Sequence, residues 1–228
     1  MQKSAQLEST IPLFPLGVVL LPHMRMPLHI FEERYKLMIK ECLAQKSEFG
    51  IVYFAGEKLM SYGCTAKIIE VLKRYEDGRS DIITRGERRF AINAIYDRRP
   101  YLQADVTFFD DQEEADLKIC GELAVKGIDL LKQYGKFSGQ QREIRFSDPG
   151  DAKDPGDVKS ISFEIAGCDG FDLMEKQKLL EMTSTYERLR KCVESLGKIL
   201  ERIKISNEIS KIINGNGNLS RHDQKPQD

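Results

Sequence analysis

Four prolines constrain the fold of this chain more than any other feature: Pro12, Pro15, Pro22 and Pro27. Proline fixes φ and lacks a backbone N–H, so no helix can run through this stretch. Strands that contain proline lie at sheet edges or at bends. Apolar residues at helical spacing begin only at Phe31. Residues 11–35 therefore predict a strand, a bend, a second strand and the start of a helix that reaches about Gln45.

Short segments rich in β-branched and aromatic residues follow this stretch. We expect strands at residues 49–54, 62–75, 80–84, 90–96 and 101–109. Asp77-Gly78 is a strong hairpin signal, and Arg85-Gly86-Glu87 is expected to turn the chain once more. Short strands with regular turns and no helix between them predict a β-barrel or a sandwich.

Helical patterns fill the second half of the chain. Acidic residues 110–114 suit a helix N-terminus, and residues 136–156, rich in Gly, Asp and Pro, predict a loop. Asp172 with Glu175 has the spacing of a capping box, and so does Ser184 with Glu187. These signals predict a helix, a tight break and a longer helix to about Ile213. Its apolar repeat also allows a coiled coil between two chains.

Several short motifs occur in one order along the chain. They are PLFPL and LPHMRMPLHIFEERY near the start, GCTAKI at 63–68, TRGERRF at 84–90 and PYLQADV at 100–106. Together they resemble the N-terminal, substrate-binding domain family of Lon proteases, and they are closer still to free-standing bacterial Lon-domain proteins. Family members often have proline where this chain has Glu33.

The resemblance implies an α+β fold, in which a PUA-like β-barrel subdomain precedes an α-helical subdomain. We therefore expect a flexible lead-in over residues 1–10 and the barrel over 11–111. The helical subdomain is expected over 112–213, followed by a disordered tail over 214–228.

Composition limits the partners and the cellular compartment. Lys and Arg number 35 and Asp and Glu 36, so the basic excess of a dedicated nucleic-acid binder is missing, and DNA is not expected as a partner. Five dispersed cysteines predict reduced thiols and a cytoplasmic protein. Residues 1–10 are polar, unlike a secretory signal, and no apolar run approaches the ~20 residues that a membrane span needs.

The residues that carry chemistry in Lon and in hydrolases have no counterpart in these 228 residues. There is no GxxxxGK[ST] phosphate loop, no GxSxG elbow and no clustered Cys/His set. His23, His29 and Glu32 are the nearest approach to a ligand set, and a metal site is not expected from them. We therefore expect binding without catalysis, and no cofactor.

The resemblance predicts a module that binds unfolded or exposed polypeptide segments in protein quality control. The expected substrate-binding residues are His23, Met24, Met26, Phe31 and Arg34, although a core role for the two methionines is equally open. One alternative is RNA binding through the arginines between 85 and 99. A second is an enzyme or sensor for a small ligand. A homodimer also remains open.

Glu32 is expected to be a structural anchor. It stands where the first helix should begin, so its carboxylate can meet free N–H groups there. Arg88 or Arg89, on a later strand, is the predicted ion-pair partner that would clamp this helix to the sheet.

Overall fold

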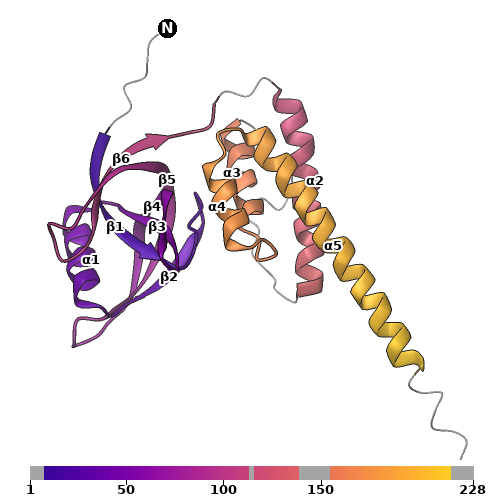
Figure 1. The fold of residues 1–228 in the computed structure, drawn as a ribbon, viewed down its shortest axis with the longest axis horizontal. Helices are drawn as coiled ribbons and strands as arrows, with labels where there is room; N and C mark the ends of the chain where they lie inside the picture. The colour runs from indigo at the N-terminus through magenta and orange to yellow at the C-terminus, as the bar shows by residue number, and fades with distance from the viewer. Residues whose placement is uncertain (1–7, 113–115, 139–154, 217–228) are drawn as a thin grey trace, which may run out of the picture.

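The computed structural model describes residues 8–112, 116–138 and 155–216. Strands and one helix form a barrel up to residue 109, and four helices form a second body after it (Figure 1). This arrangement confirms the α+β class. The first strand begins at Glu8, so the lead-in expected up to residue 10 is too long. The last helix runs to Asn216, three residues past the expected end. The loop predicted over 136–156 is too long, because residues 136–138 and 155–156 are helical. Its middle, residues 139–154, and the predicted tail from 217 onward lie outside the described residues.

The strands of the barrel close into a ring. They are β1 (Glu8–Leu16), β2 (Arg25–Ile30), β3 (Phe49–Ala55), β4 (Lys58–Arg74), β5 (Ser80–Tyr96) and β6 (Gln103–Phe109). The ring runs β1, β3, β4, β5, β6 and back to β1. Strand β2 pairs with the first part of β5, residues 80–85, and β6 pairs with the last part, residues 89–96. Only the β1–β3 pairing is parallel among these. Among the described strands, the proline-containing strand β2 pairs only with β5, so it is an edge strand. Proline is tolerated at such an edge because it has no N–H to donate to a second neighbour.

Strand β5 is continuous, so the turn expected at Arg85-Gly86-Glu87 is wrong. Gly86 serves a close approach of backbone instead. A Cβ built at residue 86 would lie 2.1 Å from the carbonyl oxygen of Leu21 in the loop between β1 and β2. That loop is tied to the same point, because His23 N–H donates to the Gly86 carbonyl at 2.8 Å and Gly86 N–H donates to Met24 at 3.0 Å. Glycine inside a strand often marks such an approach.

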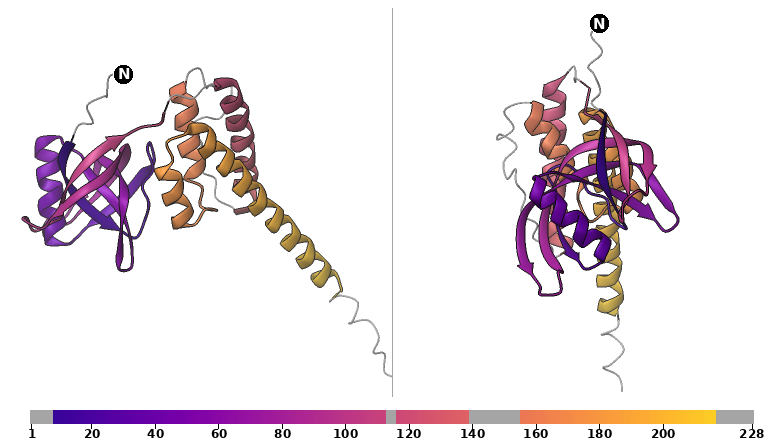
Figure 2. Two further views of the ribbon diagram at one scale, coloured as in Figure 1. Left: turned by 45° about the horizontal axis from the view of Figure 1, so that its top comes forward. Right: turned by 90° about the vertical axis from the view of Figure 1, so that its left-hand side faces the viewer.

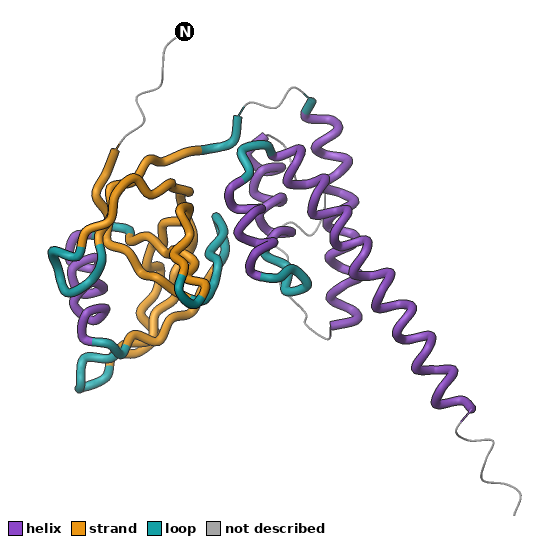
Figure 3. Tube along the Cα trace, in the orientation of Figure 1, coloured by secondary structure: helices purple, strands orange, loops and turns teal. Residues whose placement is uncertain are grey.

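Helix α1 (Glu33–Gln45) packs on the side of the barrel that faces away from the other helices (Figure 3). It buries Tyr35, Met38, Ile39 and Cys42, the residues whose spacing predicted it. It ends at Lys46, whose φ of 52° is left-handed and whose N–H donates to the Cys42 carbonyl. Glycine is the usual residue at such a position, because a Cβ is strained there.

Lys46→Gly is therefore expected to raise the free energy of unfolding by about 0.5–1 kcal/mol, since it relieves the left-handed strain. Lys40→Gly is the matched control, because Lys40 is exposed inside the same helix. The control should lower the free energy of unfolding by about 1 kcal/mol. Urea denaturation of both variants checks this, and a loss of stability in Lys46→Gly would contradict it.

The second body contains α2 (Leu117–Ser138), α3 (Pro155–Ala166), α4 (Leu173–Glu181) and α5 (Thr185–Asn216). The capping box before α4 is present: Asp172 accepts from Glu175 N–H at 2.8 Å, and Glu175 accepts from Asp172 N–H at 2.9 Å. Before α5, Ser184 Oγ accepts from Glu187 N–H at 3.1 Å. The Ser184–Glu187 pair thus lies at the predicted break, and the Asp172–Glu175 pair lies at the start of the helix that precedes the break.

Helix α5 packs along its first half and extends past the other helices along its second (Figure 2). Leu189, Cys192, Leu196 and Leu200 are buried, so this part of the apolar repeat packs within the chain. One continuous apolar cluster contains residues of the barrel and of the helices, for example Leu20 and Phe163.

Candidate functional site

Exposed rings gather on the outer face of the three-stranded part of the sheet, β2–β5–β4. Along β2, the residues at 26, 28 and 30 turn inward, whereas Pro27 and His29 turn outward. His29 faces Asp81 of β5, which in turn faces Lys73 of β4. Tyr75 directly follows β4, and Phe31 directly follows β2. The sheet register therefore brings residues 29, 31 and 75 together.

We call Phe31, His29 and Tyr75 the aromatic strip. The His29 and Phe31 rings stack at 6.0 Å with an interplanar angle of 22°, and Tyr75 meets His29 edge-on at 6.0 Å. Phe31 is 59% exposed. A largely exposed phenylalanine next to two further rings offers apolar area that nothing in the described chain covers.

Asp81 holds two of the three rings in place. Its carboxylate lies 2.5 Å from His29 Nδ1 and accepts from the Tyr75 hydroxyl at 2.8 Å. The hydrogen bonds from His29 and from Tyr75 lower the pKa of Asp81, and the bond to Asp81 raises the pKa of Tyr75. Lys73 and Arg79 lie over the Tyr75 ring at 4.5 and 4.9 Å. These contacts hold His29 and Tyr75 in a defined arrangement on the sheet.

The five predicted binding residues do not form one surface. Phe31 belongs to the strip, whereas Arg34 lies 4.6 Å over the ring of Tyr35, which is not part of the strip. His23 is exposed beyond the opposite end of β2, with a left-handed φ of 64°. Met24 is partly buried against the core, and Met26 is only 8% exposed. Met26 is therefore a core residue.

The predicted Glu32 clamp is not found in the described structure. Glu32 precedes α1 but makes no side-chain capping bond there, and it pairs with Arg34 at 2.7 Å. Arg88 pairs with Glu48 at 3.2 Å. Arg89 does anchor the barrel, but to Asp111 at 2.5 Å and not to Glu32. A partner two residues away is simply closer to Glu32 than strand β5 is.

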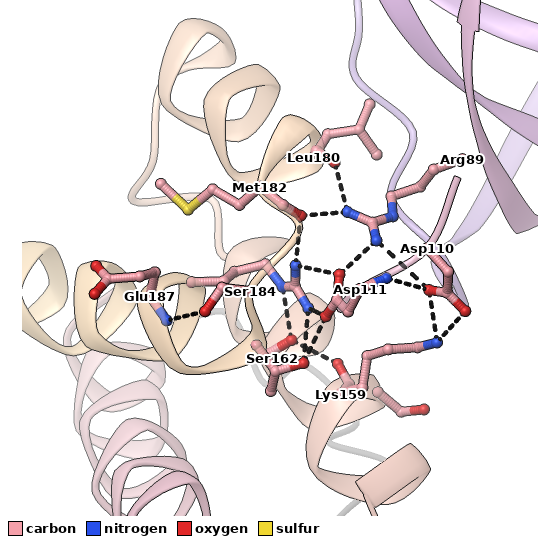
Figure 4. A network of polar contacts seen from close by, with 12 residues as sticks. Arg89, Asp110, Asp111, Lys159, Ser162, Leu180, Met182, Ser184 and Glu187 are labelled. Carbon is pink, nitrogen blue, oxygen red and sulfur yellow. Dashed lines mark hydrogen bonds and ion pairs between the residues drawn. The ribbon is translucent and has the colours of Figure 1, made fainter. Parts of the chain in front are cut away.

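Arg89 belongs to a buried network that joins the barrel to the helices (Figure 4). Asp111 lies between Arg89 of β5 and Arg188 of α5, and it also accepts from the Thr185 hydroxyl at 2.5 Å. Arg89 donates to the carbonyls of Leu180 and Met182 at the end of α4. All three charged side chains are at most 6% exposed. We call Arg89, Asp111 and Arg188 the arginine–aspartate network.

Contacts within the network shift the pKa values of Asp111 and Arg89. Burial alone would raise the pKa of Asp111, but hydrogen bonds from Arg188 and Thr185, together with the charges of both arginines, lower it. Burial lowers the pKa of Arg89, which the Asp111 charge opposes. The Arg188 guanidinium also lies 3.9 Å over the Phe163 ring, which gives this buried cation a further favourable contact. The network is structural and faces no open surface.

The structure also bears on the metal site, the RNA-binding arginines and the membrane span considered from the sequence. His23 and His29 lie at opposite ends of β2, and the described residues contain no group of three or more His, Cys, Asp or Glu that could hold a metal ion. Most arginines proposed for RNA form ion pairs: Arg85 with Glu87, Arg88 with Glu48, Arg89 with Asp111 and Arg99 with Glu41. The helices in the described residues are too short or too polar to cross a bilayer.

Comparison with known proteins decides the family. The model of the ATP-dependent protease La (LON) substrate-binding domain matches residues 10–198. The chain belongs to the LON substrate-binding domain family. The match covers both the barrel and the helices up to the middle of α5. In this LON domain, the aromatic strip and the arginine–aspartate network both lie within the matched region.

Relatives and solved structures agree with this assignment. The LON domain is 30% identical over 149 residues to a Lon protease of Parabacteroides distasonis, a match that covers 60% of this chain and 18% of that protease. It is 22% identical over 218 residues to a Lon protease of Anaeromyxobacter dehalogenans, covering 92% of this chain and 25% of that protease. The chain thus spans about a quarter or less of these relatives.

Two solved structures share the fold. One is a Lon N-terminal domain protein from Xanthomonas campestris, with a TM-score of 0.61 and 21% identity, covering 82% of this chain and 98% of that chain. The other is the N-terminal domain of the Mycobacterium avium complex Lon protease, with a TM-score of 0.64 and 22% identity, covering 83% and 98%.

Sequence reasoning named Phe31 as a candidate binding residue but did not name His29 and Tyr75, whose rings the structure places beside it. The alternation of His29 with Leu28 and Ile30 was a usable signal, since it places His29 on the face opposite the core. Tyr75 gave only a weak signal, its position just before the Asp77-Gly78 hairpin. Its contact with His29 depends on two strand registers that the alternation alone does not fix.

Proposed function

We propose that this LON domain binds polypeptide segments that folded proteins keep buried, and that it serves as a recognition module in protein quality control without acting chemically on them. The aromatic strip is the observation that carries this proposal. Apolar surface left exposed on a folded protein typically marks a site of interaction. Aromatic side chains dominate the energetics of such sites because they bury a large area at a low entropy cost.

The rigidity of the strip supports the same conclusion. Binding costs less free energy when the binding groups are already ordered. Asp81 orders His29 and Tyr75 by hydrogen bonds, and His29 in turn stacks on Phe31. Phe31 is then the ring with the most free area, flanked by paired charges such as Arg34 with Glu32 and Arg79 with Asp77. Such a surface suits apolar side chains of varied shape.

Phe31→Ser is expected to weaken binding of an unfolded protein about tenfold to thirtyfold, the effect of losing one aromatic anchor worth about 1.5–2 kcal/mol. The probe is fluorescein-labelled α-lactalbumin that has been reduced and carboxymethylated, so that it stays unfolded. Fluorescence anisotropy gives the dissociation constant. The thermal melt should hardly change, because Phe31 is mostly exposed.

Phe54→Ser is the matched control. Phe54 is 41% exposed and lies at the β3–β4 turn, at the opposite end of β4 from Tyr75. It should bind the unfolded probe as the parent does. Equal affinities for the parent and Phe31→Ser, or equal losses in both variants, would contradict the role of the strip.

The RNA alternative predicts a different salt dependence. Affinity for RNA should fall steeply between about 50 and 200 mM salt. Binding to phosphates releases counterions from the RNA, and added salt opposes that release. Binding to the aromatic strip should change little over the same range. We also propose a cytoplasmic location, because all five cysteines are buried and none forms a disulfide.

A further inference from the structure

A polar cleft of about 420 Å³ opens between the first half of β1 and the C-terminal end of α1. Thr10 and Pro12 form one wall, and Gln45, Lys46 and Ser47 form the facing wall. The aromatic strip lies at the other end of α1, where Phe31 precedes the helix. The cleft is therefore separate from the strip, although both border the same helix.

One side of the cleft is an unpaired strand edge. Strand β1 pairs with β6 through Glu8–Pro12 but with β3 only through Leu13–Leu16. The edge of β1 opposite β6 thus has no strand beside residues 8–12 among the described strands. This unpaired stretch of β1 ends at Leu13, which is the first residue of β1 that pairs with β3.

The register shows which backbone groups face this edge. Leu13 N–H donates to the Leu102 carbonyl at 2.8 Å, one step beyond the register pair Pro12 with Gln103. Hydrogen-bonded pairs alternate along an antiparallel ladder, so Ile11 and Ser9 also bond to β6. Thr10 and Pro12 lie at the alternate, non-hydrogen-bonded positions of this ladder. The N–H and carbonyl of Thr10 therefore point away from β6, toward the cleft.

Four of the five charged side chains that line the cleft form ion pairs with one another, and Lys46 is the fifth. Arg88 pairs with Glu48 at 3.2 Å, Arg99 pairs with Glu41 at 2.9 Å, and the Tyr101 hydroxyl donates to Glu41. Burial and the hydrogen bond to Glu41 raise the pKa of Tyr101 to about 12, so its hydroxyl keeps its proton at neutral pH. A compact anion would have to displace these carboxylates. A neutral ligand with alternating donors and acceptors would not.

We propose that this cleft takes the main chain of an extended polypeptide, which adds as a strand beside residues 8–12 of β1. The proposal rests on the proposed binding of polypeptides and adds a second, main-chain subsite to it. Strand addition obtains affinity from backbone hydrogen bonds at an open edge. From Phe31 to the end of α1 is about 20 Å at ~1.5 Å per helical residue, which about six extended residues span. A segment of about ten residues can therefore reach both the strip and the cleft.

Thr10→Pro tests the backbone contact, because it removes the N–H that faces the cleft. Pro12 already occupies the same phase of the same strand, so β1 accepts proline in this orientation. Thr10→Val is the matched control, since it loses only the hydroxyl that donates to Asp105. The probe is a fluorescein-labelled decapeptide of alternating serine and valine with one phenylalanine near its end. Thr10→Pro should bind it about tenfold more weakly than Thr10→Val, the effect of one or two hydrogen bonds.

A second measurement uses the unaltered protein and two modified decapeptides. In one, the odd-numbered amides are N-methylated, and in the other the even-numbered amides. An added strand turns only alternate amides toward β1. One modified peptide should therefore lose affinity at least tenfold, whereas the other should stay within about threefold of the parent peptide. This measurement decides the matter even if Thr10→Pro fails to fold.

The outcomes separate this inference from the proposed function. Equal effects of both methylation patterns, or no binding of the unmodified decapeptide, overturn the cleft proposal. If Phe31→Ser still weakens binding in that case, the strip proposal stands without the cleft. If the methylated peptides differ but Phe31→Ser binds as the parent does, the cleft proposal stands and the strip proposal fails.

Discussion

Asp111→Asn is expected to lower the free energy of unfolding by about 3–5 kcal/mol. The change removes the buried counter-charge that Arg89 and Arg188 share, although their side chains are only 2% and 0% exposed. The carboxylate that remains is Asp110, which lies 3.5 Å from Arg89 but is largely exposed, and Arg188 keeps no ion-pair partner among the described residues. An uncompensated buried charge costs far more than the pair contributes when intact. Urea denaturation followed by circular dichroism measures the loss.

Asp110→Asn is the matched control for this prediction. Asp110 is the adjacent residue, pairs with Lys159 at 2.8 Å and also lies 3.5 Å from Arg89, but its side chain is 68% exposed. Solvent screens such a pair, so the control should lose at most about 1 kcal/mol. Similar losses in the two variants would show that the buried network does not hold the barrel to the helices.

The same carboxylate predicts a pH dependence. The pKa of Asp111 is lowered in the folded protein, so its contribution to stability is fully present above its unfolded pKa of about 3.9. That contribution is lost as the pH falls through the lower folded value. The parent should therefore lose more stability than Asp111→Asn does when the pH is lowered below about 4. Parallel pH profiles would contradict this assignment.

Gly86→Ala is expected to lower the free energy of unfolding by about 3 kcal/mol, the upper part of the usual range for overpacking. Its Cβ would meet the backbone of Leu21, 2.1 Å from the oxygen and 2.9 Å from the carbonyl carbon. Backbone cannot move aside as the end of a flexible side chain can. The loop between β1 and β2 would have to leave β5 and break its hydrogen bonds to Gly86.

Gly17→Ala, in the same loop, is the control for Gly86→Ala. A Cβ at residue 17 meets nothing within 4 Å, so its free energy of unfolding should stay within about 0.5 kcal/mol of the parent. Thermal denaturation of both variants measures the difference. An unchanged melt of Gly86→Ala would mean that the loop does not rest on β5.

Local signals predicted the helices and some of the turns well. The capping pairs at residues 172 and 184 fixed where α4 and α5 begin, because capping is a contact between residues three apart. The turn expected at Gly86 was wrong for a physical reason. Glycine is required there because the backbone of Leu21, which is distant in sequence, packs against residue 86. A local sequence pattern cannot distinguish this requirement from that of a turn.

The site was harder to predict than the fold. Phe31 stood out because it follows an apolar strand and precedes charged residues. Tyr75 reaches His29 only through the pairing of β2 with β5 and of β5 with β4, and a shift of one residue would separate them. The Arg89 partner was also missed, because it depends on the β5–β6 register: Arg89 pairs with Phe109, and Asp111 lies two residues further on.

Cross-linking from residue 31 tests the central claim most directly. A photoreactive benzophenone amino acid replaces Phe31 in one variant and Phe54 in another, and each is irradiated with the unfolded α-lactalbumin probe. The aromatic strip predicts cross-links from position 31 that excess unlabelled unfolded protein suppresses, and few from position 54. Cross-links of equal yield from both positions, or none from position 31 while the probe is bound, would contradict the account.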